Sequence, residues 1–230
     1  MIQGIDVSHW QGLIDWTKVD RDFAYIKATE STNYKDDKFA LNWQGARDNG
    51  IKVGAYHFWR FATDPVKQAE YFFDYVTQHG YLGDLPPALD LEDTYAPKSN
   101  ATPAAFSKAL VRIEELFGRK PIIYTAQWWW NPWTLSNKNF SNYDLWVAFY
   151  GYKIFLPRYI PAGWTKQAIW QKSAKGSVPG VAGDCDLDEA EDDWYVKVAP
   201  SPPQTPSVPY EVSLDIPKEA DSIVLTLNRG

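Results

Sequence analysis

Two acidic residues, Asp90 and Glu92, stand two positions apart at the end of the apolar run PALDLE. Side chains two apart on a β-strand point to the same face, and the backbone positions that carry them are about 6–7 Å apart. Like-charge repulsion and desolvation would raise the pKa of one carboxyl group, which could then act as a general acid near neutral pH. The alternative is a strand end with two solvated acids.

Other chemically active side chains stand at the ends of other predicted strands. In a β/α barrel the C-terminal ends of the strands meet at one face, where catalytic residues are found. These strand ends offer no pair of histidines, no cysteine nucleophile and no glycine-rich phosphate loop, so the pattern favours chemistry by carboxyl groups with aromatic neighbours. The residues concerned are Asp6, Lys27, Tyr56, Tyr124, Tyr150 and Asp186.

Short apolar runs alternate with segments of helical spacing. Alternation of this kind predicts an α/β fold with a parallel sheet. Eight strands and fewer than eight helices favour an irregular TIM-like β/α barrel, with an open doubly wound sheet as the alternative. Strands are expected at 4–8, 23–29, 52–58, 87–92, 121–126, 145–150, 167–171 and 185–188, and the main helices at 36–49, 65–79 and 102–117.

The composition changes after Pro200. The segment SPPQTPSVP at 201–209 is typical of a stiff, extended linker. We therefore expect a catalytic domain at 1–199, a Pro-rich linker at 200–209 and a short β tail at 210–230. The tail is too short to fold alone, so it is either a docked pair of strands or the start of a truncated C-terminal module.

Charge and hydropathy exclude several classes of protein. The net charge of −6 argues against a nucleic-acid partner. No run of about 18 apolar residues predicts a membrane span, and the N-terminus lacks the pattern of a signal peptide. The 12 Trp, 14 Tyr and 11 Phe fill the core, and some of them could also stack on the apolar faces of sugar rings.

The same carboxyl groups could instead hold Mg²⁺ or Mn²⁺, which favour oxygen ligands. The acidic run 184–193 also begins like a calcium loop, but Glu189 stands in place of the glycine and Tyr195 in place of the bidentate Glu. We expect no metal and no cofactor, and most of this run in solvent. His57 is expected to be a hydrogen-bonded structural residue, and Cys185 to have a raised thiol pKa between two aspartates.

Eight segments in this order resemble the family 25 glycoside hydrolases, the Chalaropsis-type lysozymes or N-acetylmuramidases. The resemblance covers about residues 1–195 and implies an irregular β/α barrel without a cofactor. It also implies cleavage of the β-1,4 bond between N-acetylmuramic acid and N-acetylglucosamine in peptidoglycan. The segments are GIDVSHWQG at 4–12, FAYIKATES at 23–31, GAYHF at 54–58, PALDLE at 87–92, PIIYT at 121–125, LWVAFY at 145–150, IWQKS at 169–173 and VPGVAGDCDLD at 178–188.

The resemblance also implies roles for individual residues. Glu92 would be the general acid, and Asp90 would orient the 2-acetamido group of the sugar. Asp6 and Asp186 would position and polarise their neighbours, with Asp186 as a candidate base for water. Substrate contacts are implied for Tyr56, Tyr124, Lys27 and Tyr150.

Three other functions stay open at this level. They are a catalytically silent cell-wall carbohydrate-binding module, a glycosidase for a related polymer such as chitin, and a metal-dependent hydrolase. Without a signal peptide, a wall hydrolase is typical of a phage endolysin, held in the host cytoplasm until a separate pore releases it to the wall. A C-terminal wall-binding module is a further expected partner.

Overall fold

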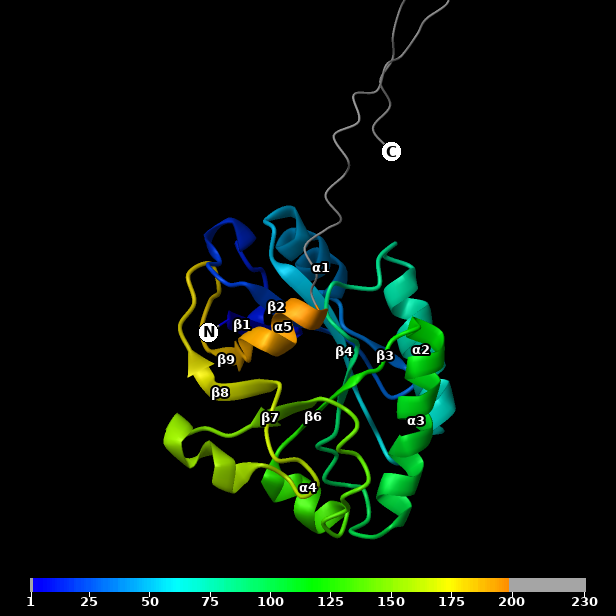
Figure 1. The fold of residues 1–230 in the computed structure, drawn as a ribbon. Coiled ribbons are helices and arrows are strands. Elements are labelled where there is room, and N and C mark those ends of the chain that lie inside the picture. The colour runs from blue at the N-terminus through cyan, green and yellow to red at the C-terminus, as the bar shows by residue number, and fades with distance from the viewer. Residues whose placement is uncertain (1, 199–230) are drawn as a thin grey trace, which may run out of the picture. The chain divides into compact units, whose positions relative to one another are not determined.

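The structure, a computed structural model, describes residues 2–198 (Figure 1). In this range eight strands pair in a ring, and the pairing of the first strand with both the second and the last closes the barrel. The predicted irregular β/α barrel is thereby confirmed. In ring order the strands are β1 (Ile2–Val7), β2 (Phe23–Glu30), β4 (Lys52–Phe58), β5 (Ala88–Asp90), β6 (Ile122–Thr125), β7 (Leu145–Ala148), β8 (Ile169–Gly176) and β9 (Cys185–Ala190).

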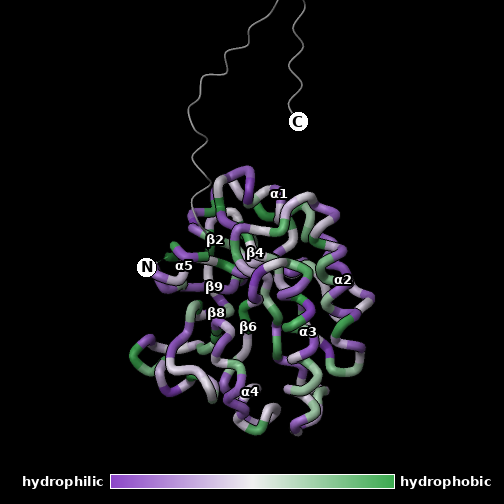
Figure 2. Tube along the Cα trace, turned by 45° about the vertical axis from the view of Figure 1, so that its right-hand side comes forward, coloured by the Kyte–Doolittle hydropathy of each residue, from purple (hydrophilic) through white to green (hydrophobic). Residues whose placement is uncertain are grey.

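Helices cover the outside of the barrel, and α2 and α3 lie side by side there (Figure 1). The predicted start of α2 is confirmed, because the Asp64 carboxylate accepts hydrogen bonds from the N–H groups of Val66 and Lys67. Hydrophilic and hydrophobic residues alternate along α2 and α3 in Figure 2, as expected of helices with one buried face. The α-helices are α1 (Phe39–Asp48), α2 (Pro65–Thr77), α3 (Ala101–Phe117), α4 (Gln127–Trp133) and α5 (Asp192–Val198).

Short elements fill the connections between strands. Strand β3 (Tyr34–Lys35) pairs only with the end of β2 and lies outside the barrel ring. The 3₁₀ helices are η1 (His9–Gln11), η2 (Trp16–Lys18) and η3 (Lys153–Tyr159). Among residues 2–198, no helix has the length and apolar character needed to cross a membrane.

The prediction of an all-parallel sheet is wrong for one strand. From β1 through β2 to β8 each neighbouring pair in the ring is parallel, but β9 runs antiparallel to both β8 and β1. The segment 177–184 between β8 and β9 is too short for the crossover that a parallel pair requires, so the two strands form a hairpin. Residues early in β9 therefore lie at the same end of the barrel as residues late in β1.

Alternation along the strands sorts side chains between two cores. In β2, Ala24, Ile26 and Ala28 pack outward against the helices, whereas Phe23 and Tyr25 fill the barrel interior. The next inward residue of β2 is Lys27. The interior is therefore aromatic at its base and polar at the end where β2 terminates.

Two glycines make room for the aromatic base. A Cβ atom on Gly4 would lie 2.2 Å from Phe23 Cζ, and one on Gly54 would lie 2.4 Å from Tyr25 Cε1. The ring of Tyr25 in turn stacks on Trp146 at 4.6 Å between centroids. Packed aromatic side chains thus fill the barrel interior below its polar end and leave no channel there.

The predicted linker at 200–209 and β tail at 210–230 lie outside the described residues, and so does the predicted truncated module. They stay predictions from the sequence.

Candidate active site

A cavity of about 270 Å³ opens at the C-terminal ends of the parallel strands. All eight residues predicted for the site line it, although they come from seven strands or the loops that follow them. The structure therefore brings together the eight side chains that were predicted for the site. The lining residues are Asp6, Val7, Ser8, Trp10, Gln11, Lys27, Tyr56, Phe58, Asp90, Glu92, Tyr124, Trp146, Tyr150, Gln171 and Asp186.

Asp90 and Glu92 lie in this cavity, while Leu89 and Leu91 pack in the outer core. Burial raises the pKa of Asp90 well above its usual range, and the neighbouring Glu92 carboxylate adds to the rise. Burial also raises the pKa of Glu92, whereas the nearby Lys27 ammonium lowers it. A carboxyl group in this position can hold a proton for donation close to neutral pH.

One oxygen of Asp90 is left for a ligand. Its Oδ1 atom is buried and has no hydrogen-bond partner within residues 2–198. A buried carboxylate oxygen without a donor is costly, and a ligand N–H group in the cavity would satisfy it.

Gln171 holds Asp6 in place. Its amide Nε2 donates to Asp6 Oδ2 at 2.7 Å. Its Oε1 accepts from the hydroxyl groups of Tyr124 and Tyr150, each at 2.9 Å. A single amide thus connects one carboxyl group to two aromatic side chains. Gln171 was not among the predicted site residues, although its place at the end of a predicted strand was the available signal.

Strand β9 delivers two carboxyl groups to the interior. Asp186 lies opposite Asp6 in the β1–β9 register, and burial raises its pKa to about 6. Asp188, two residues on, is fully buried, accepts a hydrogen bond from Trp146 Nε1 and has its pKa raised to about 8 by burial. Burial, followed by the charges of Asp186 and Asp188, also raises the pKa of Asp6.

The expectation that most of the acidic run 184–193 is solvated is wrong in part. Asp188 is buried in the barrel, and Glu189 is 8% exposed and paired with Lys153 and Lys172. Alternation along β9 turns Asp188 into the interior, and the two lysines cover Glu189 on the other face of the strand.

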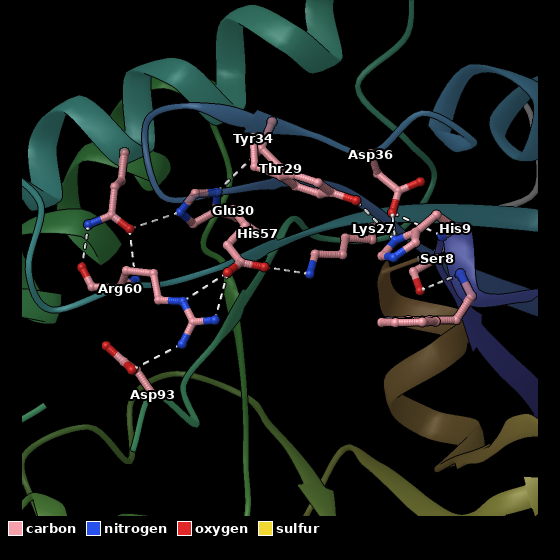
Figure 3. A network of polar contacts seen from close by, with 12 residues as sticks. Ser8, His9, Lys27, Thr29, Glu30, Tyr34, Asp36, His57, Arg60 and Asp93 are labelled. Carbon is pink, nitrogen blue, oxygen red and sulfur yellow. Dashed lines mark hydrogen bonds and ion pairs between the residues drawn. The ribbon is translucent and has the colours of Figure 1, made fainter. Parts of the chain in front are cut away.

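A chain of alternating charges fixes Lys27 at the cavity wall (Figure 3). Lys27 Nζ lies 2.8 Å from Glu30 Oε2, and Glu30 Oε1 accepts from Arg60 Nη2 at 2.7 Å and Nε at 2.9 Å. Arg60 Nη1 reaches Asp93 Oδ1 at 3.1 Å. Because Asp93 directly follows Glu92, the network connects the loop after β5 to the ammonium group that faces its acids.

Two residues outside the chemistry behave as the sequence predicts. His57 is fully buried between the Thr29 hydroxyl and the Gln68 amide, and burial lowers its pKa to about 4. Burial raises the pKa of the Cys185 thiol, and the charges of Asp6 and Asp186 add to the rise. Neither group is set up for catalysis. Within the described range, no three His, Cys, Asp or Glu side chains are grouped as ligands for a metal ion.

The sequence model of the glycosyl hydrolases family 25 matches residues 5–181, which include Asp6, Asp90 and Glu92. The chain belongs to family 25. It is therefore a glycoside hydrolase.

Named proteins that are similar to this chain support its assignment to family 25. Lysozyme M1 of Streptomyces globisporus is 40% identical over 199 residues, covering 80% of this chain and 66% of the relative. The N,O-diacetylmuramidase of a Chalaropsis species is 34% identical over 188 residues, covering 75% of this chain and 88% of the relative. The crystal structure of a bacterial lysozyme from Streptomyces coelicolor has a TM-score of 0.77 at 35% identity, with 86% of this chain and 96% of that one covered. This chain thus spans about two thirds of the Streptomyces globisporus lysozyme.

Proposed function

We propose that this family 25 chain is a lysozyme. It hydrolyses the β-1,4 bond between N-acetylmuramic acid and N-acetylglucosamine in peptidoglycan. The observation that carries the proposal is the convergence of Asp6, Asp90, Glu92 and Asp186 on one aromatic-lined cavity. Relatives named as lysozyme and N,O-diacetylmuramidase support the same substrate.

Glu92 is the general acid in this proposal. Its raised pKa keeps a proton available, and that proton passes to the glycosidic oxygen as the C–O bond breaks. The sugar ring left behind gains positive charge, which the surrounding carboxyl groups stabilise.

Asp90 directs the acetamido group of the same sugar. Its unpartnered Oδ1 accepts the acetamido N–H, which aims the acetamido oxygen at the anomeric carbon. A bond from that oxygen to the anomeric carbon replaces the broken glycosidic bond and gives an oxazolinium-type intermediate. Water then attacks the anomeric carbon, giving its proton to the Glu92 carboxylate, and the ring opens to restore the acetamido group.

The remaining residues position these groups. Asp6 and Asp186 face each other and place carboxyl oxygens close to the developing positive ring. Tyr56, Tyr124, Tyr150 and Lys27 line the cavity and bind the glycan. Asp186 is the alternative base for water if the reaction inverts the anomeric carbon.

Mass spectrometry of a peptidoglycan digest tests the function. Fragments that end in reducing N-acetylmuramic acid are expected. Fragments that end in reducing N-acetylglucosamine would assign the other glycosidic bond, and free stem peptides would assign an amidase or a peptidase.

A further inference from the structure

Trp10 is the most exposed tryptophan in the described part of the chain, yet it belongs to the catalytic cavity. Its side chain is 81% exposed and lines the same cavity as Asp6 and Glu92. A tryptophan left in water forgoes the burial that normally stabilises so large an apolar ring. A ligand bound in the adjoining cavity would explain why this side chain is exposed.

The backbone under Trp10 is locked. Ser8 caps the 3₁₀ helix that carries it: the Ser8 hydroxyl accepts from Trp10 N–H at 3.3 Å, and Ser8 N–H donates to Gln11 Oε1 at 2.9 Å. Gln11 Nε2 also donates to the carbonyl of Asp184. The indole is thus presented by a turn that is tied at both ends.

The ring itself has a support on one side. The imidazole of His9 lies 4.6 Å from the Trp10 ring, centroid to centroid, at 36°. Asp36, which is fully buried, accepts from both the backbone N–H and Nδ1 of His9 at 3.0 Å, and the Tyr34 hydroxyl lies 3.0 Å from the same Nδ1 (Figure 3). With His9 held in this way, the indole is supported without being covered.

We propose that Trp10 is a stacking platform for one pyranose ring of the glycan strand at the open margin of the catalytic cavity. The apolar C–H face of a pyranose would cover the free indole surface and leave its hydroxyl groups in water. Because the platform is already ordered, binding loses little side-chain entropy. The assignment rests on the proposed lysozyme function, since it requires a polymeric glycan as substrate.

The place of Trp10 in the barrel determines which kinetic constant it affects. Trp10 follows β1, whereas Asp90 ends β5 and Glu92 follows it, three strands further round the ring. A sugar stacked on Trp10 is therefore held across the cavity from the general acid. Contacts far from the reacting bond stabilise the bound substrate and the transition state equally, so they lower KM without raising kcat.

The test measures binding of a peptide-free tetrasaccharide of alternating N-acetylglucosamine and N-acetylmuramic acid. Isothermal titration calorimetry with Glu92→Gln as the parent avoids turnover. Adding Trp10→Ala should raise Kd about tenfold, and Trp10→Phe should restore most of the affinity. The matched control is Trp128→Ala, because Trp128 is 59% exposed but lies outside the cavity lining. It should bind like the parent.

Three results would overturn the platform, two of them with the tetrasaccharide. One is unchanged tetrasaccharide affinity in Trp10→Ala, and the other is an equal loss in Trp128→Ala. A loss seen only with peptide-bearing strands would also overturn it, since the ring would then contact the stem peptide. In the otherwise wild-type enzyme, Trp10→Ala should raise KM with kcat unchanged. Failure of the lysozyme function is distinguishable, because the wild-type enzyme would then release no reducing N-acetylmuramic acid.

Discussion

Asp188 lies buried near Asp6 inside the barrel, where Trp146 Nε1 donates to Asp188 Oδ1 at 2.8 Å and Asp188 Oδ2 has no hydrogen-bond partner among residues 2–198. Two neighbouring buried carboxyl groups repel each other when both are charged, which favours a proton on one of them. Burial raises both pKa values, that of Asp188 to about 8. The catalytic cavity therefore rests on a pair of acids that the folded chain keeps partly protonated.

This pair makes stability fall as the pH rises. A folded pKa above the unfolded value gives stability that is complete below the unfolded pKa and is lost as the pH rises through the folded pKa. For Asp188 the loss extends from about pH 4 to about pH 8. Asp188→Asn keeps an acceptor for Trp146 and cannot ionise, so its Tm at pH 8 should exceed that of the wild type by several degrees, at about 2–4 °C per kcal/mol. Thermal melts at pH 5 and pH 8 measure this, and an equal fall of Tm in both proteins would contradict it.

Glu92→Gln should remove nearly all lytic activity and leave the fold intact. The amide cannot supply the proton for the leaving oxygen, and loss of a general acid lowers the rate about 10²–10⁴-fold. Clearing of a cell-wall suspension gives the rate, and circular dichroism gives the control for folding. A folded variant with near wild-type activity would exclude Glu92 as the acid.

Asp90→Asn should lower kcat on the order of 10²-fold and change KM little. The Asp90 charge stabilises the oxazolinium-type intermediate, which does not exist when the sugar first binds. The same route gives retention at the anomeric carbon, because two displacements follow one another. NMR spectra of the first product, recorded before mutarotation, identify its anomeric configuration. An inverted product would leave Asp90 as an orienting group and make Asp186 the base for water.

Lys27→Met should move the whole pH profile of kcat/KM to higher pH. The Lys27 ammonium lowers the pKa of both Asp90 and Glu92. Without it both pKa values rise, so the acidic and the basic limb of the profile, which belong to the Asp90–Glu92 pair, shift in the same direction. Lys27→Arg keeps the charge and is the matched control. A lower rate with unmoved limbs would restrict Lys27 to substrate binding.

Lytic activity should survive a chelator. The proposed reaction uses only carboxyl groups and the acetamido group of the substrate. Turbidity loss of a wall suspension with and without EDTA decides the point. Abolition by EDTA and recovery with a divalent ion would assign a metal-dependent hydrolase.

Strand-end positions were enough to bring the eight predicted site residues to one cavity, because parallel strands in a closed barrel must bring their C-terminal ends together. Gln171 and Asp188 needed the structure. The role of Gln171 depends on three partners from other strands, and that of Asp188 depends on the antiparallel direction of β9. The length of the connection after β8 decides whether β8 and β9 form a hairpin or need a crossover. The apolar pattern placed the end of β8 too early, at residue 171 instead of residue 176. Arg60 likewise acts only through residues distant in sequence, Glu30 and Asp93.

The β1–β9 pairing has a kinetic consequence. Asp6 and Asp186 meet across the two ends of the described chain, and loop closure over so long a separation is a slow, entropically costly event. A partly folded chain in which β1 has not yet joined β9 lacks this half of the carboxyl cluster. Hydrolytic activity should therefore appear only when the ring closes, so the activity recovered on refolding reports when β1 has paired with β9.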